Sequence, residues 1–192
     1  MTTSIPIFPL GTVLYPEGML PLKIFEQRYL DMTKACLRDD SGFGVCRIEE
    51  GSEVGAPAAP AATGCSAAIV GWEMPHLGLF HLTTRGQQPF RILGRTVRKD
   101  GLIQAEVEFL EDQSGDLDAQ AFALCRSVLE QIVDRIGTGY FHPPVDYGNP
   151  RWVSYRLAEV LPLELPEKQA LLETRSDAER IARLHALLSQ SA

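Results

Sequence analysis

The sequence predicts an α+β fold in which short strands come first along the chain and helices come last. The apolar opening, residues 4–24, is interrupted by four prolines, as expected for short and bent strands. Residues 103–109 alternate apolar and polar side chains, which is the period of a strand with one buried face. From about residue 118 onward, apolar residues recur at helical spacing. Strands and helices that are segregated in this way are typical of α+β proteins.

The prolines of the opening can belong only to edge strands, strand starts or bends, because proline has no N–H to donate to a neighbouring strand. Short strands are predicted over residues 4–10, 12–15 and 20–24, with a tight turn over residues 16–18. We therefore expect the opening to form the corner of a small half-open β-barrel.

A helix follows, because the period of the sequence changes at Phe25. Phe25, Tyr29, Met32 and Cys36 follow one another at spacings of four, three and four residues, which places them on one face. This apolar face is predicted to pack on the barrel. Glu26 lies on the flank of the helix, where a free carboxylate would be costly. We expect Glu26 to pair with a backbone amide or an arginine near the start of the helix.

The rest of the first part is predicted to consist of five strands and one loop. Residues 49–64 are small, proline-rich and without periodicity, which predicts a mobile loop. The strands are predicted over residues 42–48, 65–74, 77–86, 89–97 and 102–112. The last two form a hairpin across an Asp-Gly turn.

Four helices are predicted in the second part of the chain. Ser176 and Glu179 have the spacing of a capping box at the start of the last helix. The helices are predicted over residues 118–136, 151–161, 166–174 and 176–190. We expect two domains, a barrel over residues 1–115 and a helical bundle over residues 116–192.

Composition restricts the classes of partner and of compartment. The formal net charge of −7 over 192 residues disfavours nucleic acid, which requires clustered Lys and Arg. The four cysteines are far apart and lie among apolar neighbours, which predicts buried, reduced thiols. No apolar run is long enough to span a membrane, and the first residues do not resemble a signal peptide. We expect a cytoplasmic protein without a membrane partner.

The opening motif carries a resemblance to a known family. Residues 8–32, FPLGTVLYPEGMLPLKIFEQRYLDM, resemble the N-terminal substrate-binding domain of Lon proteases (the LON domain, or peptidase S16 N-terminal-like domain). The segments FGVCRI, TRGQQPFRIL and AEVEFLED are similar to later strands of that family, and residues 165–188 are similar to its helical bundle. Gln27, Cys65 and Pro89 depart from the family pattern.

The resemblance implies a PUA-like pseudo-β-barrel of short twisted sheets, with one helix packed across it and an α-helical bundle after it. It also implies a non-catalytic module that binds unfolded polypeptide segments or a specific protein, and this domain also occurs as a stand-alone protein. The 192 residues contain no GxxxxGK[ST] motif and no segment that resembles a Ser-Lys protease domain. We therefore expect ATP-independent binding, with no catalytic residue, metal or cofactor.

Two other classes of function stay open at this point. One is an RNA-binding protein of the PUA type, and the other is an uncharacterised enzyme. A hydrolase triad of Ser66, Glu73 and either His76 or His81 has no nucleophile-elbow motif to support it. A zinc site at Cys65, His76 and His81 lacks a fourth ligand at suitable spacing.

The candidate contact residues for a bound polypeptide are apolar, aromatic or able to form hydrogen bonds. They are Pro21, Arg28, Tyr29, Phe141 and Trp152. Arg28 and Tyr29 also belong, with Phe25 and Glu26, to the structural motif at the start of the helix. A core role for Tyr29, and packing between barrel and bundle for the aromatic residues of 140–155, are the structural alternatives.

Overall fold

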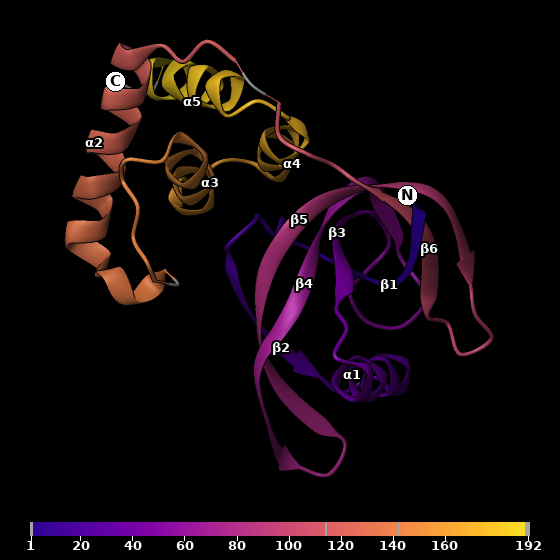
Figure 1. Cartoon of the computed structure of the whole chain (residues 1–192). Coiled ribbons are helices and arrows are strands. Elements are labelled where there is room, and N and C mark those ends of the chain that lie inside the picture. The colour runs from indigo at the N-terminus through magenta and orange to yellow at the C-terminus, as the bar shows by residue number, and fades with distance from the viewer. Residues whose placement is uncertain (1, 114, 142, 191–192) are drawn as a thin grey trace. The chain divides into compact units, whose positions relative to one another are not determined.

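The computed structural model describes residues 2–113, 115–141 and 143–190. The chain divides into two compact units, Met1–Leu110 (the N-terminal unit) and Glu111–Ala192 (the C-terminal unit). The first contains the strands and one helix, and the second contains the remaining helices (Figure 1). The predicted order of strands before helices is therefore confirmed. That the segments 1–115 and 116–192 are separate domains stays a prediction.

The six strands of the N-terminal unit form one sheet that closes on itself. The strand order is β2-β5-β4-β3-β1-β6, and β5 also pairs with β6. Strands β1, β3, β4, β5 and β6 thus form a closed ring, and β2 extends the sheet from β5 alone. Among the described strands of the sheet, the pairing of β1 with β3 alone is parallel. The strands are β1 (Thr2–Leu10), β2 (Met19–Ile24), β3 (Phe43–Glu50), β4 (Ala59–His76), β5 (Leu79–Val97) and β6 (Ile103–Phe109).

Strands β4 and β5 are much longer than the sequence pattern predicted. Strand β4 begins at Ala59, so the predicted loop over 49–64 is reduced to residues 51–58 (the 51–58 loop). Strand β5 runs through the predicted break between residues 86 and 89. Residues 12–15 form no strand, although Val13, Leu14 and Tyr15 are buried. The register of β4 against β5 shifts three times, which lets the two long strands bend around the barrel.

One core cluster of the barrel is built around the aromatic side chain of Phe90. Phe90 is fully buried and packs with Ile7, Cys46 and three residues of β6. Gly44 and Gly64 make room for it, because a Cβ atom at either position would lie 2.6 Å or 2.8 Å from the Phe90 Cζ atom. The glycines of two neighbouring strands are therefore required by the size of this ring.

A side chain added at position 44 is expected to destabilise the barrel. Gly44→Ala would bring a methyl group within 2.7 Å of Ile7 Cδ1 and 2.6 Å of Phe90 Cζ. Overpacking of this kind costs about 1–3 kcal/mol in the free energy of unfolding, which urea denaturation measures. Gly94→Ala is the matched control, because nothing lies within 4 Å of a Cβ atom there. Equal stability of the two variants would contradict the packing described.

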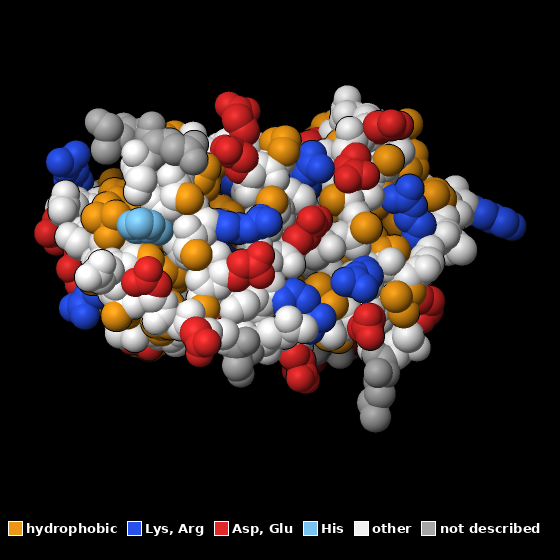
Figure 2. Space-filling view, turned by 90° about the horizontal axis from the view of Figure 1, so that it is seen from above, with side chains coloured by type: hydrophobic (Ala, Val, Ile, Leu, Met, Phe, Trp, Pro, Cys, Tyr) orange, Lys and Arg blue, Asp and Glu red, His pale blue; other side chains and the backbone are white. Residues whose placement is uncertain are grey.

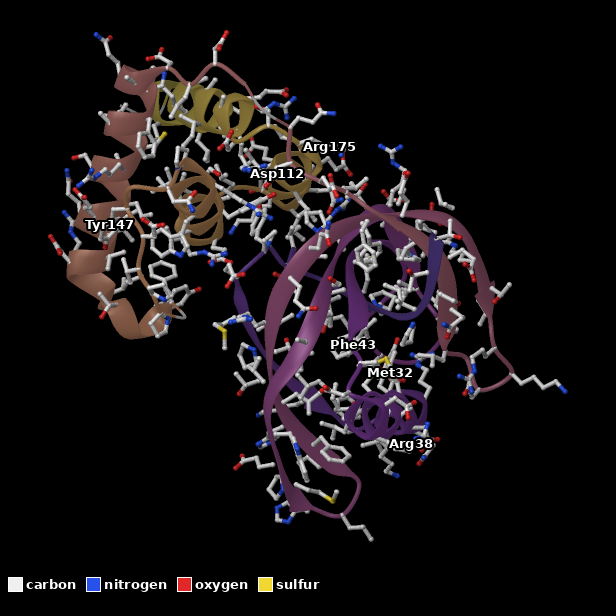
Figure 3. The ribbon with its side chains drawn as sticks, viewed as in Figure 1. Met32, Arg38, Phe43, Asp112, Tyr147 and Arg175 are labelled. Atoms are coloured by element: carbon white, nitrogen blue, oxygen red, sulfur yellow. The ribbon has the colours of Figure 1, made fainter. Side chains whose placement is uncertain are left out.

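Helix α1 (Gln27–Asp39) packs its apolar face on the barrel, as predicted for Tyr29, Met32 and Cys36. Met32 points toward the barrel, where Phe43 of β3 lies (Figure 3). The prediction that Phe25 begins this face is wrong. The helix begins two residues later, and the Phe25 side chain is 54% exposed.

The C-terminal unit consists of four α-helices and one 3-10 turn. Helices α2, α3 and α5 contact one another, and α4 contacts α3. Asp118 caps α2 by accepting hydrogen bonds from the Gln120 and Ala121 amides, and Glu179 N–H donates to Ser176 Oγ near the start of α5. The bounds are α2 (Ala119–Ile136), the 3-10 turn (Thr138–Tyr140), α3 (Pro150–Val160), α4 (Leu165–Glu173) and α5 (Asp177–Gln190).

The four cysteines are free and buried, as predicted. Burial raises the pKa of the Cys46 thiol to about 12 and that of the Cys125 thiol to about 11. Because the thiolate is the reactive form, these side chains act as small apolar groups of the two cores. Among the described residues, no helix combines the length and the apolar character needed to cross a membrane.

Candidate functional site

Strand β2 lies at an open edge of the sheet. Among the described strands it pairs with β5 alone. Its side chains alternate, so that Leu22 and Ile24 are buried under the sheet while Pro21 and Lys23 are exposed on the outer face. Pro21 is tolerated here because an edge strand has one side without a hydrogen-bonded neighbour.

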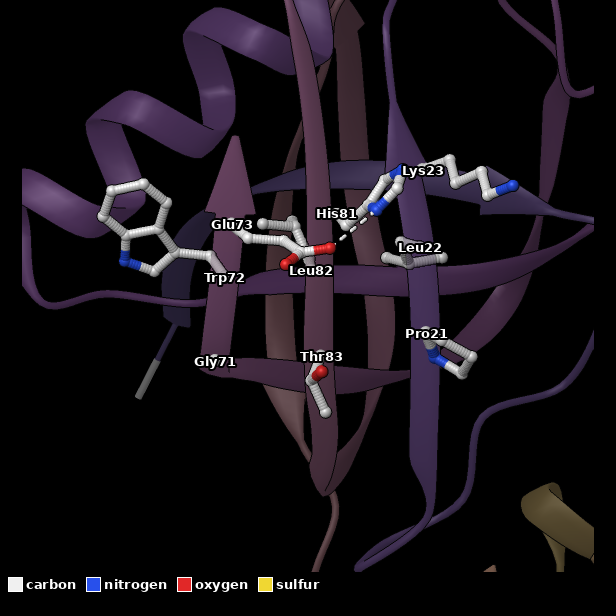
Figure 4. A pocket seen from close by; sticks show the side chains of 9 residues that line it. All are labelled: Pro21, Leu22, Lys23, Gly71, Trp72, Glu73, His81, Leu82 and Thr83. Atoms are coloured by element: carbon white, nitrogen blue, oxygen red, sulfur yellow. Dashed lines mark hydrogen bonds and ion pairs between the residues drawn. The ribbon is translucent and has the colours of Figure 1, made fainter. Parts of the chain in front are cut away.

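A groove of about 620 Å³ runs across the outer face of β2, β5 and β4. Three side chains from the three strands form one cross-strand row, Lys23, His81 and Glu73. In the next row Pro21 and Thr83 lie beside Gly71, whose lack of a side chain leaves the groove open at this point (Figure 4). The groove offers both polar and apolar surface.

A second cavity, of about 280 Å³, lies on the inner side of β2. Its lining is shared with the outer groove at Pro21, Leu22 and Lys23, so the two hollows meet along β2. Most of its lining is apolar. It consists of Phe8, Leu10, Leu22, Ile24, Phe25 and Tyr29, with Glu26, Glu53 and Val54 at its border. We call this cavity the inner pocket.

Two carboxylates hold the 51–58 loop beside the inner pocket. Glu53 Oε1 accepts a hydrogen bond from the Gly11 amide at 2.6 Å, and Glu26 Oε2 accepts one from the Gly55 amide at 3.2 Å. Glu26 also forms an ion pair with Arg28 at 3.0 Å. The prediction that Glu26 pairs with a backbone amide or an arginine is therefore confirmed, and both partners are present at once.

Several large apolar side chains are exposed on β4 and at the turn that follows it. Val70, Trp72 and Met74 lie two residues apart along β4, and Leu77 at the β4–β5 turn is 99% exposed. Trp72 is 55% exposed and meets the buried Phe80 edge to face, with ring centroids 5.7 Å apart. Sequence reasoning did not single out these residues. The signal that could have found them is the alternation of large apolar residues at 70, 72 and 74.

The predicted contact residues of the N-terminal unit lie at different depths. Pro21 is exposed and borders both the outer groove and the inner pocket. Tyr29 is 5% exposed, stacks on Phe8 with ring centroids 4.1 Å apart and forms part of the inner pocket. Burial is the main cause that raises the pKa of its hydroxyl. Arg28 is buried, and its guanidinium lies 4.7 Å from the Tyr29 ring centroid.

The two predicted contact residues of the C-terminal unit are buried within that unit. The Phe141 and Trp152 rings meet edge to face at 5.7 Å, and Trp152 makes a similar contact with Tyr147 at 5.6 Å (Figure 3 labels Tyr147). Phe141 is 5% and Trp152 is 8% exposed. A contact role for these two aromatic side chains stays a prediction, and it requires that the cluster open.

The residues of the alternative hydrolase triad are only partly brought together. His81 Nδ1 lies 3.0 Å from Glu73 Oε1. The Ser66 hydroxyl instead donates to the Gln88 carbonyl and accepts from the Gln88 amide, both at 3.1 Å. The Ser66 hydroxyl is thus engaged with the main chain rather than with a histidine. In the part of the chain that the structure describes, no three His, Cys, Asp or Glu side chains are grouped so as to hold a metal ion.

Charges of both signs are mixed on the surface. On the face shown in Figure 2, Lys and Arg side chains are interspersed with Asp and Glu side chains. Many are ion pairs within one element, such as Arg126 with Glu130 and Arg38 with Asp39. A nucleic-acid site requires basic side chains that are gathered on one surface, and this face does not offer one.

The family model of the ATP-dependent protease La (LON) substrate-binding domain matches residues 4–190. This match covers both units. The chain belongs to the Lon substrate-binding domain family. Curated relatives include a Lon protease of Anaeromyxobacter dehalogenans (strain 2CP-C) and Lon protease 2 of Myxococcus xanthus, each 27% identical over 179 residues. The alignment covers 88% of this chain and 21% of each relative, so the chain spans about a fifth of their length.

Solved structures of Lon N-terminal domains share the fold. A Lon N-terminal domain protein from Xanthomonas campestris is 34% identical with a TM-score of 0.80, and the match covers 96% of this chain and 98% of that one. The N-terminal domain of a Mycobacterium avium complex Lon protease superposes with a TM-score of 0.71 at 16% identity, covering 99% and 100%. The PUA-like barrel followed by a helical bundle is therefore the fold of a Lon substrate-binding domain.

Proposed function

We propose that this Lon-type domain binds unfolded polypeptide segments in the hollows on either side of β2. The observation that carries the proposal is the position of the exposed apolar side chains. Phe25, Val54 and Trp72 are each more than half exposed, and each borders the inner pocket or the outer groove. Apolar side chains that are gathered beside a concave surface are a common feature of protein-binding sites.

Hydrophobic burial is the expected source of affinity at this site. It contributes roughly 25 cal/mol for each Å² of apolar surface removed from water and requires no particular sequence. A segment of an unfolded chain has such surface to offer, whereas a folded protein has buried most of its own. The family match supports this substrate class, because the matching model is that of a substrate-binding domain.

Among the contact residues expected from the sequence, Pro21 and Tyr29 fit this site best, because both line the inner pocket. Arg28 acts through Glu26, whose carboxylate it helps to place beside the 51–58 loop. Phe141 and Trp152 are buried in their aromatic cluster, so we propose no contact between them and the bound segment. The role is one of binding without catalysis or a cofactor, and a cytoplasmic location is proposed with it.

Loss of an exposed aromatic side chain beside β2 is expected to weaken binding. Trp72→Ser and Phe25→Ser should each raise the Kd for a permanently unfolded, carboxymethylated protein by about tenfold, because each removes apolar contact area of the order of 1–2 kcal/mol. Fluorescence anisotropy of the labelled unfolded protein measures the Kd, with circular dichroism as the check of folding.

The matched control is Leu93→Ser. Leu93 is 54% exposed on β5 and lines neither the inner pocket nor the outer groove. It should leave the Kd unchanged. An equal loss of binding in all three variants would contradict the proposed site, and absence of binding by the unchanged protein would contradict the function itself.

A further inference from the structure

We propose that the polypeptide binds to the free edge of β2 as an added antiparallel strand, with an acidic residue beside Lys23 and apolar residues on both sides of it in sequence. This inference rests on the proposed function and specifies the chemistry of the bound segment. It follows from the direction of the main-chain groups of β2, from the charge at Lys23 and from the lining of the inner pocket.

The main-chain groups of alternate β2 residues point away from β5. The Gly18 carbonyl accepts a hydrogen bond from the Gly86 amide, and the Leu20 carbonyl accepts one from Thr84 Oγ1. Both carbonyls therefore face β5. Successive residues of a strand point their main-chain N–H and C=O groups to opposite sides. The main-chain groups of Pro21 and Lys23 therefore point to the free edge, while their side chains lie on the outer face.

These directions fix the register of an added strand. Pro21 has no N–H. Its carbonyl can accept one hydrogen bond, but Pro21 cannot exchange a pair of hydrogen bonds with the residue opposite it. Lys23 offers both its N–H and its carbonyl. The residue opposite Lys23 can therefore exchange two main-chain hydrogen bonds, and its side chain then lies directly beside the Lys23 side chain on the outer face.

The charge beside Lys23 favours an acidic residue at that position. Lys23 is exposed, and within the described residues no carboxylate forms an ion pair with it. The Glu73 carboxylate belongs to β4 and is engaged by His81. An added strand would lie three strand spacings from β4, roughly 14 Å, which exceeds the screening length at physiological salt. Repulsion by Glu73 is therefore small.

The residues on each side of the acidic one would point to the inner face, alongside Leu22 and Ile24. That face leads to the inner pocket, whose deeper lining includes Phe8, Leu10 and Tyr29. The carboxylates at its border, Glu26 and Glu53, already accept hydrogen bonds from backbone amides. The pocket thus favours apolar side chains, and the alternation keeps the acidic side chain on the opposite face.

An exchange of charges tests this arrangement. The probes are two blocked heptapeptides with one apolar residue on each side of a central aspartate or a central lysine. The unchanged protein should bind the aspartate peptide about five to tenfold more tightly, and Lys23→Glu should reverse this preference, as expected for a cross-strand ion pair. Lys99→Glu, at an exposed turn of the same unit, is the control and should leave the preference unchanged.

Methylation of a peptide amide tests the strand pairing. N-methylation of the central aspartate removes one of the two hydrogen bonds to Lys23 and should weaken binding at least tenfold, whereas methylation of the next amide, which faces away from β2, should have little effect. Equal effects of the two methylations, or a preference that Lys23→Glu leaves unchanged, would overturn the strand addition. In that case, if both peptides still bound and Trp72→Ser weakened their binding, the proposed function would stand and only the strand addition would be wrong.

Discussion

Arg180→Ala is expected to lower the free energy of unfolding of the C-terminal unit by about 3–5 kcal/mol, because it removes the centre of a buried polar cluster. Arg180 is 0% exposed. Its Nε donates to Ser154 Oγ at 2.9 Å, and its Nη1 donates to the Thr174 carbonyl. The guanidinium lies 3.8 Å from the centroid of the Tyr155 ring. Truncation would leave a cavity as well as buried groups without their partner.

The planar arrangement of the Arg180 guanidinium N–H donors, and not its charge alone, should account for the lost free energy of unfolding. Arg180→Lys is therefore expected to recover little of it, because an ammonium group cannot reproduce the planar contacts. Arg183→Ala is the matched control one turn later. Arg183 is exposed and has only a 3.7 Å pair with Glu179, so about 0.5 kcal/mol or less should be lost.

Tryptophan fluorescence can follow the C-terminal unit by itself. The chain has two tryptophans, Trp72 in the N-terminal unit and Trp152 in the C-terminal unit. In a Trp72→Phe background, urea denaturation followed by tryptophan emission reports on the surroundings of Trp152 alone. A loss below 1 kcal/mol for Arg180→Ala would show that the cluster contributes little to stability.

Glu159 is expected to make the stability of the C-terminal unit fall as pH rises from about 4.5 to about 7. Burial raises the pKa of this carboxyl from 4.5 to about 7, against the opposing effects of Arg156 and Lys168. Arg156 Nη2 lies 2.8 Å from Glu159 Oε1, and Lys168 Nζ donates to the Glu159 carbonyl at 3.0 Å. The carboxyl thus lies in a largely desolvated pair.

The sign follows from proton uptake on folding. Between the unfolded and the folded pKa, the folded state holds the Glu159 proton while the unfolded state has released it, so each rise in pH favours unfolding. The contribution of Glu159 to the free energy of unfolding is complete below pH 4.5 and is lost as pH reaches about 7. Its total is up to about 3 kcal/mol. Burial lowers the pKa of Lys168 from its ordinary value of 10.5, and the nearby Glu159 opposes this shift.

Glu159→Gln isolates this contribution, because its amide does not titrate. The difference in unfolding free energy between the unchanged protein and the variant, measured at several pH values between 4 and 8, should decrease with rising pH by up to about 3 kcal/mol. All other ionisable side chains are the same in both proteins, so their effects cancel in the difference. A difference that is constant with pH, or that rises, would contradict a raised pKa.

The sequence indicated only part of the candidate site, because two of the five expected contact residues, Pro21 and Tyr29, line the hollows beside β2. The prolines of the opening allowed edge strands, strand starts or bends; β2 is an edge strand, whereas β1, which contains Pro6 and Pro9, pairs with both β3 and β6. Glu26 was correctly expected to have a partner. Trp72 and Phe25 escaped prediction as surface residues, since large apolar side chains are buried more often than exposed. The helix begins after Phe25, and this places its ring outside the packed face.

By itself, the sequence determined the local features of this protein: strands before helices, the hairpin of residues 89–97 and 102–112, the cap at Ser176, and the family. These depend on neighbouring residues, on period and on the chemistry of proline and glycine. Only the tertiary structure decided that β1 pairs with both β3 and β6 to close the barrel and that two hollows meet along β2. Such features join residues far apart in the chain, and periodicity within a segment carries no information about which distant strand it meets.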